Sequence, residues 1–311
     1  MKKTGIENIG VYIPERKLSN FDRKEELGID DAFITDKIGI RSVARKEEDE
    51  EASDLCVKAF QNLLTKQSID LSTIEVAIVV TQNPDYNIPH TAAIVHKKLN
   101  LPETTAAYDI SLGCSGYVYG LATIESFMEM HGFTKGLLFT ADPYSKIVDP
   151  EDKNTSLLFG DAATVTLLSD TPAYRSGKFT FGTSGENYDK LICADRLHMN
   201  GRSIFNFVAK FIPQDIKSLL EKNQMEISDV DLFAFHQGSK YLADTLVRRM
   251  RLEGDKVPFD AGSYGNTVSS SIPIILEKYL CGQEGQKTYN KVVISGFGVG
   301  LSWASTVLFK V

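Results

Sequence analysis

One of the four cysteines, Cys114, lies in a setting that could support nucleophilic chemistry. In residues 109–117, an apolar strand-like approach ends in small residues, and a helical pattern follows the cysteine. A cysteine at a helix N-terminus faces unpaired N–H groups and the positive end of the helix dipole, which favour the reactive thiolate. Cys114 is therefore a candidate nucleophile, with a buried, unreactive cysteine as the alternative. The remaining cysteines lack such a setting and are interpreted as structural: Cys56, Cys193 and Cys281.

A histidine and an asparagine occupy positions that could complete such a site. His236 follows the apolar run at residues 232–235, and active sites of α/β sheets gather at strand ends. Asn266 lies in a glycine-rich turn, residues 262–271, that leads into another helical pattern. A satisfied core histidine and a locally bonded turn asparagine are the simpler alternatives. Taken one at a time, neither residue defines a site.

The segment at residues 296–303 is dense in glycine and lies between two strand patterns. A backbone without side chains can line a ligand, and its N–H groups could receive an oxyanion. The segment superficially resembles a dinucleotide-binding loop. Because a strand follows it where such loops require a helix, we do not predict a dinucleotide site.

Apolar, β-branched runs predict the strands, and apolar residues at helical spacing predict helices between them. Strands are expected at residues 76–80, 136–140, 163–168, 232–235, 292–294 and 305–309. Helices are expected at residues 52–64, 117–130, 205–222, 240–251 and 273–279. Strands that alternate with helices in this way indicate an α/β fold with largely buried sheets.

The order of these elements repeats with a period of about 150 residues. Each copy runs from a helix to a strand, then to a small-residue turn with its helix, and then to two strands. The turn carries Cys114 in the first copy and Asn266 in the second. We therefore predict two similar halves, residues 1–170 and 171–311. The repeat also makes Asn266 the counterpart of the candidate nucleophile.

The composition of the 311 residues narrows the class of protein. The formal net charge is −7, and phosphate binding requires a basic face, so nucleic-acid binding is not expected. No run approaches the roughly 18 apolar residues of a membrane span, and the first residues do not resemble a signal peptide. Widely spaced cysteines without a Cys-x-x-Cys pair indicate a reduced, cytoplasmic protein without a zinc site.

Together these motifs resemble the β-ketoacyl-acyl-carrier-protein synthase III family of the thiolase superfamily. The resemblance runs from Gly10 to the C-terminus. It is carried by residues 31–34, 39–41, 113–116, 159–163, 236–237, 265–267 and the loop around Gly298. It implies a thiolase-like α/β fold with two pseudo-symmetric βαβαβαββ halves in five layers (α-β-α-β-α). It also implies a homodimer in which the central sheets of two copies join.

The resemblance implies a role for each site residue. Cys114 would take an acyl group from acyl-CoA, and the N–H groups of Cys114 and Val299 would form the oxyanion hole. Phe297 would lie beside the malonyl site. His236 and Asn266 would hold the thioester carbonyl of malonyl-carrier protein and stabilise the enolate formed when carbon dioxide leaves. No metal or redox cofactor is implied, because decarboxylation itself supplies the carbanion.

The resemblance also implies where CoA would bind. Phe33 matches a tryptophan that stacks on adenine, and Lys37 and Lys153 match arginines that stack on adenine or meet phosphates. Lysine keeps the charge but loses planar stacking and bidentate contacts, which leaves the acyl donor open. Ile88 takes the place of a phenylalanine that the partner subunit contributes to the acyl pocket. The wall of the pantetheine tunnel is matched by Gly201, Ile204 and Phe205.

Acyl carrier protein is acidic, so its docking site on this acidic chain must be a local basic patch. The candidate residues lie on and just beyond the predicted helix after His236: Lys240, Arg248, Arg249 and Arg251. A solvated helix end is the alternative interpretation.

Three other classes of protein are alternatives to a condensing enzyme. Papain-like proteases also run Cys, His, Asn, but their cysteine lies near the mature N-terminus, in secreted proteins with disulfides. A thiolase-fold acyltransferase of secondary metabolism would pass the acyl group to a hydroxyl or amine. A non-catalytic partner subunit would not need the intact set of Cys114, His236 and Asn266.

Overall fold

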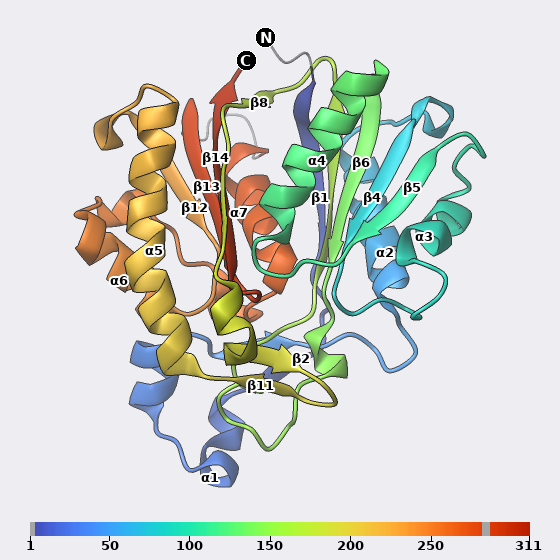
Figure 1. Cartoon of the computed structure of the whole chain (residues 1–311). Coiled ribbons are helices and arrows are strands. Elements are labelled where there is room, and N and C mark those ends of the chain that lie inside the picture. The colour runs from blue at the N-terminus through green and yellow to red at the C-terminus, as the bar shows by residue number, and fades with distance from the viewer. Residues whose placement is uncertain (1–3, 282–286) are drawn as a thin grey trace.

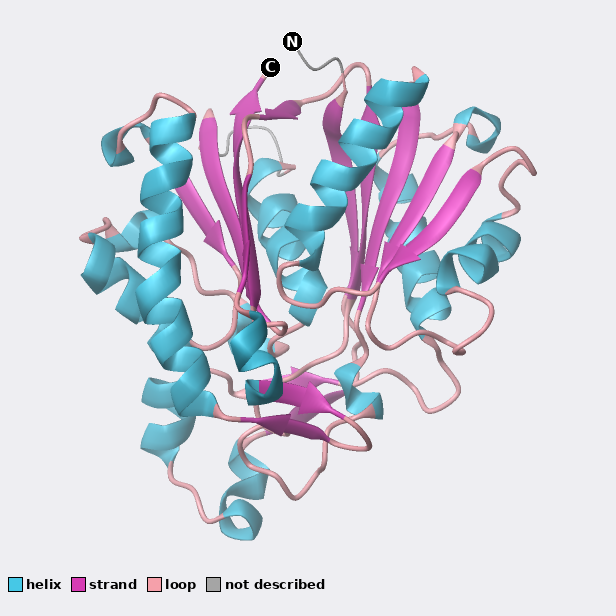
Figure 2. Cartoon of the chain, viewed as in Figure 1, coloured by secondary structure: helices cyan, strands magenta, loops and turns pink. Residues whose placement is uncertain are grey.

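The computed structural model describes residues 4–281 and 287–311, and its strands and helices stack in five layers (Figure 2). The strands of the first half are β1 (Gly5–Tyr12), β4 (Val76–Val80), β5 (Ala106–Ile110), β6 (Lys135–Ala141) and β7 (Ala163–Ser169). Those of the second are β8 (Tyr174–Ser176), β9 (Thr180–Thr183), β12 (Leu232–Phe235), β13 (Lys291–Gly298) and β14 (Ser302–Lys310). Two hairpins add β2 (Lys17–Ser19), β3 (Ser42–Ala44), β10 (Leu191–Cys193) and β11 (Leu197–Met199). The helices are α1 (Lys24–Leu27), α2 (Ala52–Lys66), α3 (Thr91–Leu99), α4 (Gly116–His131), α5 (Gly201–Lys222), α6 (Lys240–Met250) and α7 (Ser271–Leu280).

The two sets of strands pair in the same pattern. In the first half β4 is parallel to β5 and β6, while β7 is antiparallel to both β6 and β1. In the second, β12 is parallel to β13, while β14 is antiparallel to both β13 and β9. β8 pairs with β14 and with β1, and so links the two sets along one edge. This equivalence agrees with the predicted repeat, and the boundary at residue 170 stays a prediction.

The second half departs from the βαβαβαββ order in one place. Between α6 and α7 the chain forms short 3-10 turns, Gly254–Lys256 and Ala261–Ser263, where the first half has β5. β5 is the edge strand of its set, so the second half loses an edge and not the middle of its sheet.

The central layer consists of α4 and α7, which lie between the two sets of strands (Figure 1). α2 and α3 cover the outer face of the first set, and α5 and α6 cover the outer face of the second. Tyr117 and Ile124 of α4 pack in one apolar cluster with Val80 of β4, Ile294 of β13 and Ile275 of α7. Burial of one helix against both halves makes them a single hydrophobic unit. Among the described residues, no helix has the length and apolar character of a membrane span.

The predicted strands and helices are confirmed, and β1 and α3 are among the elements that were missed. β1 was missed because glycine and polar residues interrupt its apolar pattern. One of those glycines, Gly10, lies so close to α2 that an added Cβ would be 2.3 Å from the carbonyl oxygen of Ala59. α3 has only nine residues, too few for a clear helical period.

The two halves meet backbone to backbone near the turn that contains Asn266. Phe159 and Asn266 form an isolated parallel bridge. The N–H of Asn266 donates to the carbonyl of Leu158 at 2.7 Å, and the N–H of Gly160 donates back to the carbonyl of Asn266 at 3.0 Å. An added Cβ at Gly160 would lie 1.8 Å from the carbonyl oxygen of Tyr264. The seam therefore fixes the turn and requires glycine at position 160.

Gly160→Ala should open this seam, because neither backbone can move without breaking hydrogen bonds. We expect the free energy of unfolding to fall by about 1–3 kcal/mol or more, as for other overpacked interiors. Urea denaturation measures the change. The matched control is Gly254→Ala, since nothing lies within 4 Å of a Cβ at that position. Equal stability of the two variants would contradict the role given to the seam.

Candidate active site

Cys114 lies on the short loop between β5 and α4, and only 4% of its surface is exposed. The glycine-rich end of β13 covers it from the second half of the chain. An added Cβ at Gly298 would lie 2.6 Å from the Cys114 sulfur, and one at Gly296 would lie 2.6 Å from the Cys114 carbonyl oxygen. The glycines predicted to line a ligand therefore first allow the backbone to pack onto the cysteine.

Two backbone N–H groups, those of Val299 and of Cys114 itself, point at the Cys114 sulfur and lower its pKa. Burial acts in the opposite direction and is larger, so the pKa of the thiol is raised to about 12. The expectation that a helix N-terminus would favour the thiolate is therefore wrong for the resting chain. The sequence pattern predicted the N–H groups near the sulfur. It did not predict that the backbone at the end of β13 would exclude water from the sulfur.

His236 lies directly after β12 and is buried, with its ring edge-on to Phe297 at a centroid distance of 5.7 Å. Burial lowers the pKa of His236 to about 3, so the ring is neutral at ordinary pH. Its Nδ1 lies 2.7 Å from the hydroxyl of Ser271, which accepts a hydrogen bond from the N–H of Gln237. A hydroxyl that accepts there can donate to Nδ1, which leaves the ring proton on Nε2.

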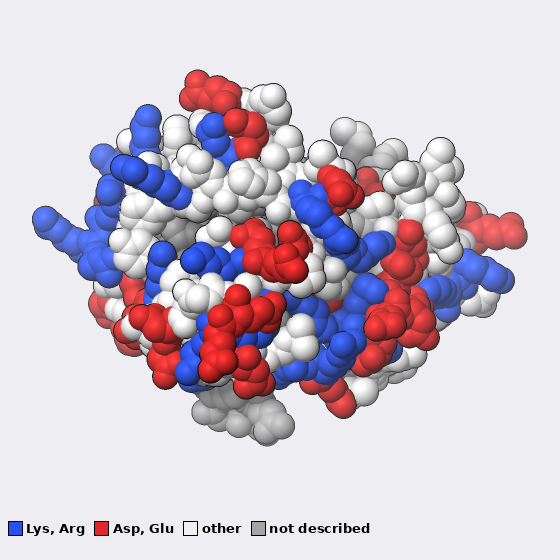
Figure 3. Space-filling view, turned by 90° about the horizontal axis from the view of Figure 1, so that it is seen from below, with Lys and Arg blue, Asp and Glu red and all other residues white. Residues whose placement is uncertain are grey.

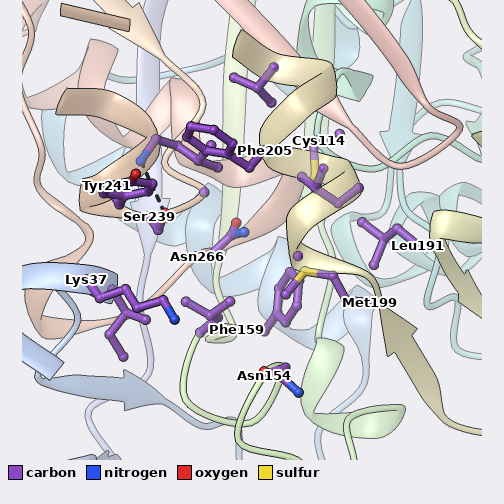
Figure 4. Close-up of a pocket in the computed structure, with 18 of the residues that line it drawn as sticks. Lys37, Cys114, Asn154, Phe159, Leu191, Met199, Phe205, Ser239, Tyr241 and Asn266 are labelled. Atoms are coloured by element: carbon purple, nitrogen blue, oxygen red, sulfur yellow. Dashed lines mark hydrogen bonds between the residues drawn. The ribbon is translucent and has the colours of Figure 1, made fainter. Parts of the chain in front are cut away.

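Asn266 is buried in the turn before α7, and its side chain points into the cavity (Figure 4). Its Oδ1 accepts a hydrogen bond from the N–H of Val268 at 2.9 Å. That bond distinguishes the two ends of the amide and leaves Nδ2 as the end that can donate to a ligand. Val268 has φ +53°, a left-handed conformation that is costly for a β-branched residue, so the turn must be held by its surroundings.

A cavity of about 470 Å³ brings the candidate residues together. Cys114, His236, Asn266 and Phe297 all line it. The six residues predicted to contact CoA line the same cavity: Phe33, Lys37, Lys153, Gly201, Ile204 and Phe205. Residues from both halves of the chain thus form one continuous path from the surface to the buried sulfur.

At the mouth of this cavity, cations lie beside aromatic rings. The Lys37 ammonium lies 4.8 Å from the centre of the Phe33 ring. Tyr241 stacks on Phe205 with a centroid distance of 5.2 Å, and Arg202 lines the cavity next to Gly201. Tyr241 and Arg202 were not predicted from the sequence, although they adjoin the predicted residues Lys240 and Gly201. Within the described residues, no group of three or more His, Cys, Asp or Glu side chains is arranged to hold a metal ion.

Ile88 and the four basic residues predicted to dock the carrier protein lie outside this cavity. Ile88 is 88% exposed on its own chain. Lys240 is paired with Asp244 at 2.5 Å, so part of its charge is already balanced. The guanidinium of Arg248 donates to the Thr245 hydroxyl at 3.1 Å. Two further side chains are exposed at the end of α6: Arg249 and Arg251.

Comparison with known proteins places this site in a family. Residues 108–185 match the family model of 3-oxoacyl-[acyl-carrier-protein] synthase III, and residues 220–309 match the model of its C-terminal part. The β-ketoacyl-[acyl-carrier-protein] synthase III of Streptococcus gordonii is 31% identical, with 99% of each chain covered. A putative 3-oxoacyl-[acyl-carrier-protein] synthase 3 of Campylobacter jejuni is 32% identical, with 98% of this chain and 94% of that protein covered.

Solved structures agree with the sequence comparisons. The synthase III of Thermus thermophilus has a TM-score of 0.90 and 32% identity, and the match covers 98% of each chain. The 3-oxoacyl-(acyl-carrier-protein) synthase of Burkholderia xenovorans has a TM-score of 0.91 and 30% identity over 99% of this chain and 94% of that one. These matches confirm the predicted thiolase-like α/β fold and exclude a papain-like protease. The chain therefore belongs to the β-ketoacyl-acyl-carrier-protein synthase III family of acyl-transferring condensing enzymes.

Proposed function

We propose that this chain loads an acyl group from acyl-CoA onto Cys114 and condenses it with malonyl-carrier protein, in fatty acid or related biosynthesis. The observation that carries the proposal is the meeting of Cys114, His236 and Asn266 in one cavity, with two N–H groups on the sulfur. Each group suits one part of a two-step reaction, and no step requires a metal or redox cofactor.

In the first step, the Cys114 sulfur attacks the thioester carbonyl of acyl-CoA. A new S–C bond forms, the bond to the CoA sulfur breaks, and the thiol proton ends on the CoA thiolate. The N–H groups of Cys114 and Val299 receive the negative charge on the carbonyl oxygen of the tetrahedral intermediate. Since the pKa of the free thiol is about 12, proton loss belongs to the attack and not to the resting state.

In the second step, malonyl-carrier protein places its thioester carbonyl against His236 and Asn266. The carbon–carbon bond to the carboxylate breaks and carbon dioxide leaves. The electron pair of that bond stays on the α-carbon and forms an enolate. Nε2–H of His236 and Nδ2–H of Asn266 donate to the enolate oxygen. The enolate carbon then attacks the acyl group on Cys114, whose sulfur departs and recovers a proton. A neutral histidine suits this role, since it donates without giving up its proton.

The mouth of the cavity suits a phosphorylated donor. Lys37 supplies positive charge beside the Phe33 ring, where the nucleotide end of CoA would lie, and Lys153 lines the same cavity. For the carrier protein, we propose the end of α6 near Arg248 and Arg249. In Figure 3, Lys and Arg side chains gather at the left edge, on the side of α6, while both signs of charge mix over the centre. A local patch of this kind could steer an acidic carrier.

We further propose that two copies of the chain form a dimer. β5 is an edge strand whose residues are only half-buried, so its backbone can pair with a second strand. Beside it, Tyr119, Phe127 and Met130 of α4 form a shallow apolar hollow with Phe181 of β9. Met130 is 81% exposed, and exposed apolar side chains that lie together are typical of a surface that a partner covers. Ile88 would then reach the acyl pocket of the second copy.

A cytoplasmic location is also proposed. It is supported by four cysteines that are all free.

Incubation with a panel of acyl-CoAs should add one acyl group to Cys114, detected by intact-protein mass spectrometry and peptide mapping. Malonyl-carrier protein should then discharge it with release of carbon dioxide. Cys114→Ala is the control that abolishes the adduct. Absence of an adduct with every CoA or carrier thioester would overturn the proposal. Discharge by an alcohol or amine, but not by malonyl-carrier protein, would favour the alternative of a thiolase-fold acyltransferase of secondary metabolism.

His236→Ala should separate the two steps, because the ring donates to the malonyl carbonyl and not to the sulfur. We expect self-acylation to stay within a few-fold of wild type, while malonyl decarboxylation falls roughly 10²- to 10³-fold, as for other oxyanion donors. Single-turnover acylation and carbon dioxide release measure the two steps. Asn266→Ala should show the same split. An equal loss of both steps would mean that His236 serves Cys114 directly.

A further inference from the structure

A buried carboxylate, Asp142, lies behind the site and has no part in the two steps above. It directly follows β6 and is fully buried. Its Oδ1 accepts a hydrogen bond from the N–H of Gln82, after β4, at 2.7 Å. Its Oδ2 accepts one from the hydroxyl of Ser269 at 2.5 Å, and the backbone N–H of Ser269 donates to the carboxylate as well. One side chain thus ties two strand ends of the first half to the turn that contains Asn266.

Three consecutive serines fasten this turn, each to a different partner. Ser269 bonds to Asp142, and Ser271 lies 2.7 Å from Nδ1 of His236. Ser270 lies between them and bonds to the Thr140 hydroxyl at 2.8 Å, within the strand layer. The left-handed residue Val268 directly precedes the first serine. Because such a conformation persists only when its neighbours hold it, the bond to the carboxylate carries particular weight.

The same carboxylate also acts on the nucleophile through its charge. After burial, it is the nearby charge that raises the pKa of Cys114. Burial raises the pKa of Asp142 itself to about 6, against the hydrogen bonds from Gln82 and Ser269, so it is ionised at neutral pH. The charge of Asp142 also acts on Tyr144 and Cys56, and burial raises the pKa of both, which keeps them neutral.

We propose that Asp142 is a positioning residue of the condensation: its carboxylate fixes the Asn266 turn against the ends of β4 and β6. This inference rests on the roles proposed above for Cys114 and Asn266. It differs from a packing role because the hydrogen bonds of the carboxylate position the turn, while its charge adds to the burial that keeps Cys114 a thiol.

Substitutions at two positions can separate these effects. Oδ1 of Asp142 accepts the N–H of Gln82 and Oδ2 accepts the Ser269 hydroxyl, and an amide has only one oxygen, so Asp142→Asn removes one acceptor as well as the charge. Asp142→Glu keeps the charge but displaces the carboxylate by one methylene. Ser269→Ala keeps the charge and removes one donor. Ser218→Ala is the control, the same substitution at an exposed position of α5.

The experiment measures malonyl decarboxylation and the rate at which iodoacetamide alkylates Cys114 at pH 8. Asp142→Asn should lose about 10²-fold in decarboxylation, the scale of a small misplacement, and should alkylate several-fold faster than wild type. Asp142→Glu and Ser269→Ala should also lose decarboxylation, the latter by roughly tenfold. Neither should alkylate faster, because both retain the charge. Ser218→Ala should stay within about twofold of wild type in both assays.

Two results would overturn the inference. If Ser269→Ala decarboxylates as well as Ser218→Ala, the carboxylate does not position the turn. If Asp142→Glu alkylates as fast as Asp142→Asn, loosened packing and not charge controls the thiol. Should Asp142→Asn fail to fold, Ser269→Ala and Asp142→Glu still decide both points. Failure of wild-type Cys114 to accept any acyl group would be a separate result, against the proposed function itself.

Discussion

The site depends on one close contact, the packing of the glycine-rich end of β13 onto Cys114. The contact leaves no room for a Cβ at Gly296 or Gly298. It removes water from the sulfur, which raises the pKa of the thiol, and it brings the N–H of Val299 to the same atom. Because β13 belongs to the second half and Cys114 to the first, the two halves must be registered to within a fraction of an ångström. The backbone seam at Gly160 and the buried α4 supply that registration.

A consequence is that the two reacting partners rest as neutral groups. The thiol has a pKa of about 12 and His236 one of about 3, both because they are buried. A thiolate–imidazolium pair, as in cysteine proteases, would be disfavoured here. In the proposed reaction the substrate supplies the charge: an oxyanion for the N–H groups at the sulfur, and an enolate for His236 and Asn266. The carboxylate of Asp142 lies behind the site rather than in it.

Much of the fold and of the candidate site could be predicted from the sequence, because both follow from local patterns of residues. The periodic spacing of apolar residues predicts the buried strands and the longer helices. Small residues before a helical pattern predict the Cys114 and Asn266 turns. The missed features depend on contacts far apart in the chain. Nothing around Asp142 signals a ligand for Ser269, and nothing near Cys114 reveals how fully β13 covers it. Ile88 is exposed on its own chain, and its proposed place in an acyl pocket depends on the proposed dimer.

The most direct test of the central claim is the single-turnover rate of acyl transfer from CoA to Cys114 in Gly298→Ala. An added methyl group would displace the strand end from the sulfur and take the Val299 N–H with it. We predict a loss of about 10²-fold or more, the scale for removal of an oxyanion donor, with Gly254→Ala at the wild-type rate. Acylation of Gly298→Ala at the wild-type rate would show that the close packing of β13 on Cys114 is not what makes the cysteine reactive.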